Sequence, residues 1–311
     1  MIEAGLITAR FLHLAVVMAL FGLALFPLYS YPAGGNAPLA QLSRWLSASI
    51  WCLAFLALAS ALAWGWFTIV AMTGAIPAVG ADSLLTVLRE TSFGQVWVAR
   101  LALVVGLLTL IRRRSNQQRP DWTIMQLAAL LLVSLALVGH TNTSDGVLWV
   151  VHIGADCAHL LAAGAWFGGL LALAYLLVIA RRCPSAEHTA RATATLARFS
   201  GMGYAAVAAL IASGLVNAWV LVGSPQNLIT TPYGQLLLVK LCLFAGMLAL
   251  AAQNRFRLVP RLQRWKQASM PAEAPLRVVR RNVLIEQTLG VLIVLIVAWL
   301  GTLPPAIGPS D

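Results

Sequence analysis

Eight apolar stretches, each long enough to cross a lipid bilayer with about 20 residues, dominate this sequence. Their lengths leave little chain for anything except spans and short connections. Only 10% of the residues are charged and 60% are hydrophobic, whereas soluble domains carry about 25% charged residues. The sequence therefore predicts an all-α polytopic membrane protein, a single integral domain over 1–311, with spans near 5–29, 44–71, 95–111, 122–140, 149–180, 199–222, 235–253 and 282–303.

Basic residues are confined to alternate connections between these stretches. Three connections hold clusters of arginine, whereas 223–234 has no charged residue and 141–148 has only Asp145. Basic connections stay on the cytoplasmic side, so both termini are predicted to be periplasmic. The net charge of +11 is explained by these topology signals and by contacts with lipid headgroups, and no nucleic-acid partner is expected. The basic residues are Arg112, Arg113, Arg114, Arg119, Arg181, Arg182, Arg191, Arg198, Arg255, Arg257, Arg261, Arg264, Lys266, Arg277, Arg280 and Arg281.

The sequence also repeats itself. Phe93-Gly94-Gln95 with Arg100 recurs as Tyr233-Gly234-Gln235 with Lys240, and His13 with Gly22 recurs as His159 with Gly168. A third match relates Ser60 and Trp66 to Ser213 and Trp219. The three matches occur in the same order along the chain, which indicates two four-helix halves in parallel orientation, 1–140 and 141–311.

Three ionisable residues lie at helical spacing in the fifth apolar stretch. Positions i, i+4 and i+7 fall on one face of a helix, so His152, Asp156 and His159 are predicted to form one column. Ionisable groups inside a membrane normally face a partner, a cavity or an ion. Gly164 and Gly168, on the same stretch, form a GxxxG motif that predicts close approach of another helix.

Four of the five histidines are predicted to lie in the outer half of the membrane. Together with Asp156 they form a candidate metal site. Imidazole and carboxylate suit copper, zinc, iron or nickel. The repeat would bring His13 and His159 face to face between the halves. The predicted ligands are His13, His140, His152, Asp156 and His159, with Met18, Arg100 and Lys240 ranked lower.

The two basic residues of the repeat allow two interpretations. Arg100 and Lys240 either pair with Asp156 or extend to the outer interface. Packing is the alternative for every histidine, because a histidine on a buried helix is often a hydrogen-bonded core residue. Between 81 and 90 the apolar spacing predicts a short amphipathic helix on the outer surface.

Several motifs together resemble the copper-resistance protein D (CopD) family. These are Gly139-His140, the helix from His152 into Trp166-Phe167-Gly168-Gly169-Leu170, and Thr231-Pro232-Tyr233-Gly234-Gln235 with Lys240. The resemblance implies a bacterial inner-membrane protein of eight spans that handles copper, with uptake from periplasm to cytoplasm as the usual inference. It also implies a periplasmic copper-binding partner of the copper-resistance C type, which would be a separate chain here.

Three functions follow from these observations. The first is a copper permease, with copper ion as cargo in an unresolved oxidation state. The second is a b-type membrane cytochrome, in which His13 with His159 or His140 would ligate haem b axially. The third is a copper-binding scaffold or sensor that transports nothing. No nucleotide-binding loop, nucleophile elbow or HExxH motif is present, so an enzyme is expected only under the haem interpretation.

Overall fold

The computed structural model describes residues 2–31, 39–73, 81–113, 121–138, 146–182, 186–261 and 273–307, and throughout these ranges the regular structure is helical. The long helices are α1 (Ile2–Ser30), α2 (Ala40–Thr73), α4 (Ser92–Arg113), α6 (Gly146–Arg182), α7 (Ala186–Val222), α9 (Pro232–Gln253) and α11 (Glu273–Leu300). Shorter elements are α3 (Ala81–Glu90), α5 (Trp122–Val133), α8 (Pro225–Thr230), the 3₁₀ turn η1 (Ala136–Val138) and the π-helical turn η3 (Asn254–Leu258).

Seven helices are long and apolar enough to span a membrane, which confirms the polytopic all-helical prediction for the described residues. The predicted fourth span is shorter than expected, because α5 ends at Val133 and only η1 continues it to Val138. The predicted amphipathic helix is confirmed as α3, with the expected bounds. Helix α7 begins at Ala186, well before the apolar stretch near 199, so its first turns carry polar residues such as Arg191.

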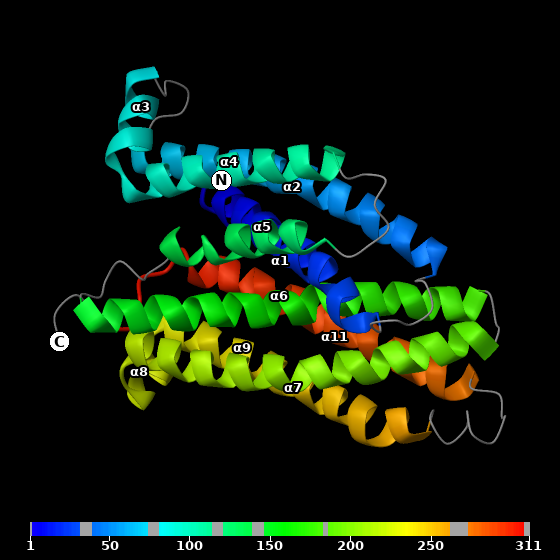
Figure 1. Ribbon diagram of the computed structural model, residues 1–311. Coiled ribbons are helices and arrows are strands. Elements are labelled where there is room, and N and C mark those ends of the chain that lie inside the picture. The colour runs from blue at the N-terminus through cyan, green and yellow to red at the C-terminus, as the bar shows by residue number, and fades with distance from the viewer. Residues whose placement is uncertain are drawn as a thin grey trace.

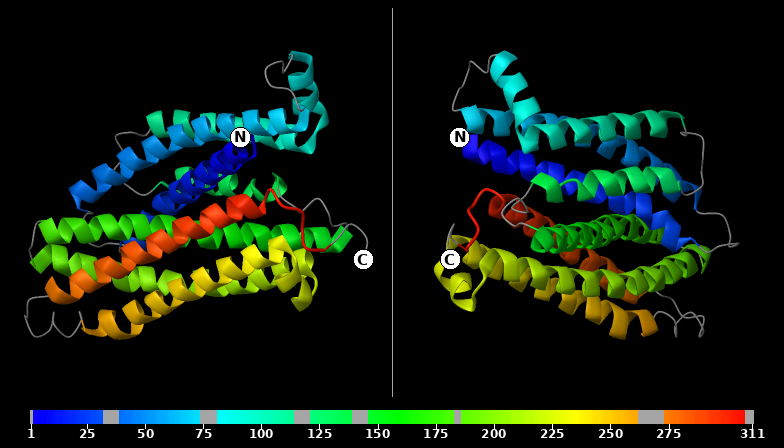
Figure 2. Two further views of the ribbon diagram at one scale, coloured as in Figure 1. Left: turned by 180° about the vertical axis from the view of Figure 1, so that it is seen from behind. Right: turned by 60° about the vertical axis from the view of Figure 1, so that its left-hand side comes forward.

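The helices form two groups that meet along α1 and α6. Helices α2, α4 and α5 pack with α1 on one side, and α7, α9 and α11 pack with α6 on the other (Figure 1). The two rotated views show the same order, with α2 and α4 at one edge and α7 and α9 at the opposite edge (Figure 2). Two apolar cores lie in the bundle, and α1, α2, α6 and α11 contribute buried residues to both.

Two glycines allow α1 and α6 to cross closely. A Cβ atom on Gly22 would lie 2.3 Å from the carbonyl oxygen of Gly164 and 2.6 Å from Cα of Gly168, and a Cβ on Gly168 would lie 2.6 Å from Cα of Gly22. The close approach predicted from the GxxxG motif is thus confirmed. Gly22 and Gly168 are also equivalent positions of the sequence repeat, as expected for residues near a pseudo-two-fold axis.

The same turn precedes α4 and α9. The hydroxyl of Thr91 donates to Val87 O (2.6 Å) and accepts from Gly94 N (3.0 Å); that of Thr231 donates to Asn227 O (2.6 Å) and accepts from Gly234 N (3.0 Å). The side chains of Gln95 and Gln235 then cap a carbonyl six residues earlier in each case. The same bonds therefore occur at positions that are equivalent in the sequence repeat.

Both ends of the described chain lie at the same end of the bundle. The backbone amides of Ala306 and Ile307 donate to Leu221 O near the end of α7, next to α8. Gly5, in the first turn of α1, packs against Phe67 near the end of α2. Helices α3 and α8 share this end of the bundle (Figure 1).

Candidate cation-binding site

In the first half, His13 is fully buried and bonded through both ring nitrogens. The Ser60 hydroxyl donates to Leu56 O (2.6 Å), so its oxygen accepts from Nδ1–H of His13 at 2.9 Å. This arrangement places the lone pair of the neutral ring on Nε2. Arg100 donates a short hydrogen bond from Nη2 to that nitrogen. In this conformation His13 therefore has no free nitrogen for a metal ion or for haem iron.

Arg100 is held by first-half residues only. It is 1% exposed, and Nη1 donates to Ser134 Oγ (2.7 Å) and to Leu131 O (3.3 Å). Both sequence-based interpretations of Arg100 are wrong, because the guanidinium neither pairs with Asp156 nor extends to the interface. A rigid, planar group with five donors fits this enclosed set of acceptors.

Trp64 completes this first cluster. The guanidinium carbons of Arg10 and Arg100 lie 5.3 Å and 5.7 Å from the centroid of the Trp64 ring, and the His13 ring lies 5.6 Å from it. Cation–π attraction stabilises guanidinium groups in such positions. The first half thus encloses a cationic cluster built around an indole.

In the second half, His159 occupies the equivalent position with a different neighbourhood. The Ser213 hydroxyl donates to Ala209 O (2.5 Å) and accepts from Nδ1–H of His159 at 3.0 Å. The lone pair again lies on Nε2, but among the described residues this nitrogen has no hydrogen-bond partner. A metal-ligating histidine usually donates a hydrogen bond from one ring nitrogen, which fixes its tautomer, and keeps the other nitrogen free for the metal.

Asp156 lies one turn from His159 on α6. Its Oδ1 accepts a hydrogen bond of 2.6 Å from Asn217 Nδ2, and Tyr233 and Lys240 lie within electrostatic reach of its carboxylate. Lys240 also lies within electrostatic reach of His159. One of the two predicted interpretations of Lys240, its pairing with Asp156, agrees with this arrangement.

An amide oxygen beside Asp156 adds a further donor. The Asn217 side chain gives its nitrogen to Asp156, and its Oδ1 is buried without a hydrogen-bond partner in the described part of the chain. A buried amide oxygen without a partner is rare, because it loses its bonds to water without replacement. Asp156, His159 and Asn217 therefore present three lone-pair donors on adjacent faces of α6 and α7.

The other predicted ligands are more dispersed. His152 is buried near the start of α6, and its Nδ1 has no hydrogen-bond partner within the described ranges. Met18 is buried in the first-half core, and His140 lies outside the described residues. Seven residues of helix extend about 10 Å, so His152 and His159 are too far apart along α6 to bind one ion.

No group of three His, Cys, Asp or Glu side chains close enough to hold a metal ion occurs among the residues that the structure covers. The amide oxygen of Asn217 is a further donor outside these four residue types. The predicted five-residue metal set stays a prediction, with His13 engaged by Arg100 in this conformation.

The two clusters occupy equivalent positions of the repeat. The histidine, the serine and the basic residue are retained, whereas the three surrounding residues change from arginine, tryptophan and phenylalanine to aspartate, asparagine and tyrosine. The matched pairs are His13 and His159, Ser60 and Ser213, Arg100 and Lys240, Arg10 and Asp156, Trp64 and Asn217, and Phe93 and Tyr233. The roles of both serines and of Asn217 were not predicted, since serine and asparagine in apolar helices normally bond to the helix backbone or to a neighbouring helix.

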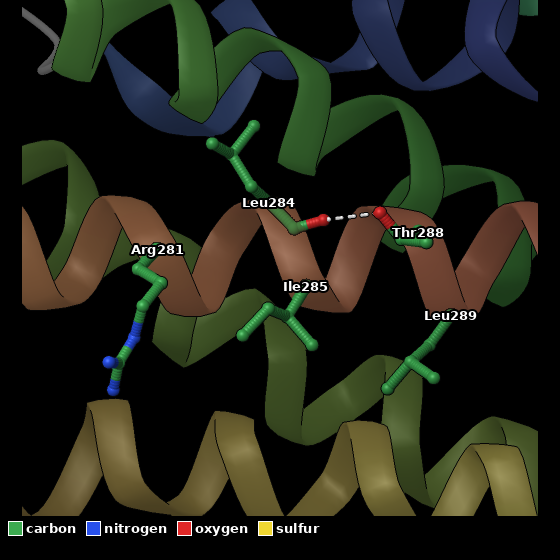
Figure 3. Close-up of a pocket in the computed structure, with 5 residues that line it drawn as sticks. All are labelled: Arg281, Leu284, Ile285, Thr288 and Leu289. Atoms are coloured by element: carbon green, nitrogen blue, oxygen red, sulfur yellow. Dashed lines mark hydrogen bonds between the residues drawn. The ribbon is translucent and has the colours of Figure 1, made fainter.

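A groove along α11 is separate from both clusters. It is lined by one cation and four largely apolar side chains, and Thr288 in it bonds back to Leu284 O (Figure 3). Leu284 and Ile285 are 50% and 41% exposed. An apolar groove on a spanning helix suits lipid chains and offers no ligand for a cation. The lining residues are Arg281, Leu284, Ile285, Thr288 and Leu289.

Two families match this chain. The family Copper resistance protein D matches residues 193–300, and the family Copper resistance protein D-like, N-terminal domain, matches residues 1–150. Together they cover the first half and most of the second. No solved structure matches the chain.

Three known proteins are similar to this chain in sequence. The chain is 34% identical to Copper resistance protein D of Pseudomonas syringae pv. tomato, over 96% of each protein. It is 30% identical to Inner membrane protein YebZ of Escherichia coli K12, over 96% of this chain and 98% of YebZ. It is 35% identical to Copper transport protein CutJ of Bacillus subtilis 168, over 53% of this chain and 30% of CutJ.

Proposed function

Because the chain belongs to the copper resistance protein D family, we propose that it is a multi-pass inner-membrane protein that moves copper ions from the periplasm to the cytoplasm. The names of its relatives support a copper-related membrane function, and CutJ is named a copper transport protein. The inner-membrane location is supported by YebZ and by the seven long apolar helices.

One observation carries this proposal: the second half presents an open nitrogen and an unpartnered amide oxygen beside a carboxylate, where the first half presents a closed cluster. The free Nε2 of His159, the Asp156 carboxylate and the unpartnered Oδ1 of Asn217 lie on facing helices. Imidazole nitrogen binds both copper oxidation states, and oxygen donors favour Cu(II). Copper is the cargo here, and these residues form its outer binding site.

Lys240 acts in this proposal as the resident cation of the closed site. Its ammonium group neutralises Asp156 when no metal is bound. An arriving copper ion replaces that charge, and the lysine side chain moves away on its flexible four-carbon stem. Arg100, at the equivalent position, cannot move in this way because three acceptors hold its guanidinium.

The proposed topology has eight spans and periplasmic termini, with α5 and η1 as the fourth, shorter span. It is supported by the basic residues that follow α4, α6 and α9, and by the location of both chain ends at the opposite end of the bundle. In this orientation the Asp156 site lies in the outer half of the membrane. His152 and His140 would lie on the way in from the periplasm.

A separate periplasmic protein of the copper-resistance C type is the proposed source of copper. The short helices α3 and α8 lie at the proposed periplasmic end and offer surfaces for it (Figure 1). Membrane lipids cover the apolar helix faces. An ATPase is not part of the proposal, so the gradient of the ion or the partner supplies the driving force.

Copper flux tests the proposal. Purified protein in liposomes is expected to raise copper uptake above empty liposomes, and Asp156→Asn is expected to abolish the increase. Glu187→Gln is a matched control, since Glu187 is an exposed carboxylate that pairs with Arg191. Copper binding without flux in the wild type would instead favour the scaffold or sensor. A Soret band in the purified protein would favour the haem alternative.

A further inference from the structure

A second carboxyl is buried in the second half, far from the proposed copper site. Glu286 of α11 is 2% exposed and lies toward the end of the bundle at which the basic residues of η3 and α11 are located. Its Oε1 accepts a hydrogen bond of 2.7 Å from Asn254 Nδ2, and the Trp166 indole also donates to the carboxyl. Asn254 and Trp166 are both neutral donors.

Two amides extend this group toward the surface. Asn282 Nδ2 donates to Asn254 Oδ1 (2.8 Å) and to Gln253 Oε1 (3.1 Å). Asn254 and Asn282 are buried, whereas Gln253 is exposed. A chain of polar side chains therefore connects a buried carboxyl with the exposed end of α9.

No cation pairs with Glu286 among the described residues. The elements packed on α11 bring three residues to this region: Trp166 from α6, Gln253 from α9 and Asn254 from η3. Helix α1 also packs on α11, but its Arg10 lies beside Gly301, at the far end of α11. Arg255 bonds to Tyr204, and Arg281 lines the groove in Figure 3. In the described part of the chain, Arg257, Arg277 and Arg280 make no hydrogen bond or ion pair with Glu286.

Helices α6 and α9 connect the region of the proposed copper site with the region of Glu286. Lys240, Met247 and Asn254 are spaced seven residues apart and share one face of α9, and His159 and Trp166 are spaced likewise on α6. Met247 is buried in the same core and lies 4.0 Å from the Cβ position of Gly290, one turn from Glu286. The second half thus contains a line of polar and thioether groups from the outer site to Glu286.

An unpaired carboxylate at such depth is strongly disfavoured, so the group is neutralised either by a proton or by a passing cation. The local backbone adds an independent sign of function: Asn254 opens a π-helical turn, a rare element that is frequent at functional sites. Two hydrogen bonds also leave lone pairs of the carboxyl open.

We propose that Glu286 is a proton-binding site at the cytoplasmic end of the second half, where its carboxyl exchanges a proton with the cytoplasm at the end of α9 at which Asn254, Asn282 and Gln253 lie. The proton is bound in the conformation seen here. When a copper cation arrives beside the carboxyl, the O–H bond breaks, the proton leaves to the cytoplasm and the carboxylate balances the charge of the cation. The proton returns when the cation leaves. The exchange of this proton for a copper cation rests on the proposed copper transport, whereas the proton site itself does not.

Infrared spectroscopy of the purified protein tests the proton site without copper. At neutral pH the wild type is expected to show the C=O stretching band of a protonated carboxyl, and Glu286→Gln is expected to remove it. Gln preserves an acceptor for Asn254 and Trp166, so the fold is retained. Glu187→Gln, at an exposed carboxylate, is expected to leave the band unchanged. Absence of the band in the wild type, or its persistence in Glu286→Gln, would overturn the proposal.

Adding copper tests the link to transport. The band is expected to disappear on copper addition in the wild type and to persist in Asp156→Asn, which lacks the outer site. A wild-type protein that binds copper without any change in the band would overturn the role of Glu286 on the copper route. If the wild type binds no copper, the proposed function fails. The C=O band of the copper-free protein then still shows whether Glu286 binds a proton.

Discussion

The two halves of the molecule place a histidine, a serine and a basic residue at matching positions, yet only one half leaves the histidine accessible. In the first half Arg100 occupies Nε2 of His13, and in the second half Nε2 of His159 is unbonded within the described residues. The serine bond is almost the same length in both, 2.9 Å and 3.0 Å. The framework is thus shared, and the difference lies in what approaches the second ring nitrogen.

Under the proposed function, this difference would divide structure and function between the two predicted halves. The first half has a closed cationic cluster, and the second half has an acid with nearby oxygen and nitrogen donors. The residues that differ at equivalent positions are Arg10 and Asp156, Trp64 and Asn217, and Arg100 and Lys240. Arginine suits the closed cluster because its fork fixes several acceptors, and lysine suits the open one because its ammonium is a mobile point charge.

The largest effect is expected for Asp156→Asn. This change removes the carboxylate of the second cluster and keeps its size, so copper affinity is expected to fall about 100-fold. The copper affinity is measured by isothermal titration calorimetry of the detergent-purified protein. Glu187→Gln is expected to bind copper like the wild type, and an unchanged affinity in Asp156→Asn would remove the second half as the cation site.

Arg100→Met and Lys240→Met are expected to act in opposite ways. Arg100→Met leaves Ser134 Oγ and His13 Nε2 without this donor, while Leu131 O still accepts from the Ser134 hydroxyl. We expect a loss of about 3 kcal/mol of stability, seen as a lower Tm in detergent, with copper affinity unchanged. Lys240→Met removes the cation that competes with copper, and tighter binding by roughly 10-fold is expected. Equal effects of the two changes would contradict the division between the halves.

Gly168→Ala tests the seam between the halves. The added Cβ would lie 2.6 Å from Cα of Gly22, so the helices must separate, and a loss of about 1–3 kcal/mol in unfolding free energy is expected. Gly154→Ala, on the same helix, is the matched control because nothing lies within 4 Å of its Cβ position. Thermal unfolding compares the stability of the two variants. A Gly168→Ala protein as stable as Gly154→Ala would mean that the close crossing of α1 and α6 is not required.

The smallest effects are expected for the serines. Ser213→Ala removes the bond that fixes the tautomer of His159, and copper affinity is expected to fall by about 5-fold, which corresponds to about 1 kcal/mol. Ser60→Ala is expected to lower stability by a similar amount and to leave copper affinity unchanged. The two variants are compared by titration and by unfolding, and a drop in copper affinity in Ser60→Ala would count against the model of a purely structural first half.

Most of the fold could be predicted from the sequence because apolar length and charge placement determine spans. The bounds of α3 and the glycine crossing of α1 and α6 follow from spacing alone. The short α5 could not be predicted, since its apolar stretch continues beyond Val133 while the α-helix does not. The family resemblance stated from the motifs is confirmed by two matching families.

The site was predictable only in part. Helical spacing placed Asp156 and His159 together, and the repeat identified the pairs to compare. Spacing gives no information on which ring nitrogen is occupied, and the bond from Arg100 to His13 joins residues of different helices whose rotation depends on packing. The Glu286 network likewise requires α6, α9 and α11 in register.

Copper titration of His159→Gln beside His13→Gln tests the central claim most directly, because the two histidines are equivalent in the repeat. Loss of His159 is expected to weaken copper binding at least 10-fold, whereas loss of His13 is expected to lower the Tm and leave the affinity unchanged. Equal losses of affinity, or a larger loss in His13→Gln, would contradict a copper site confined to the second half.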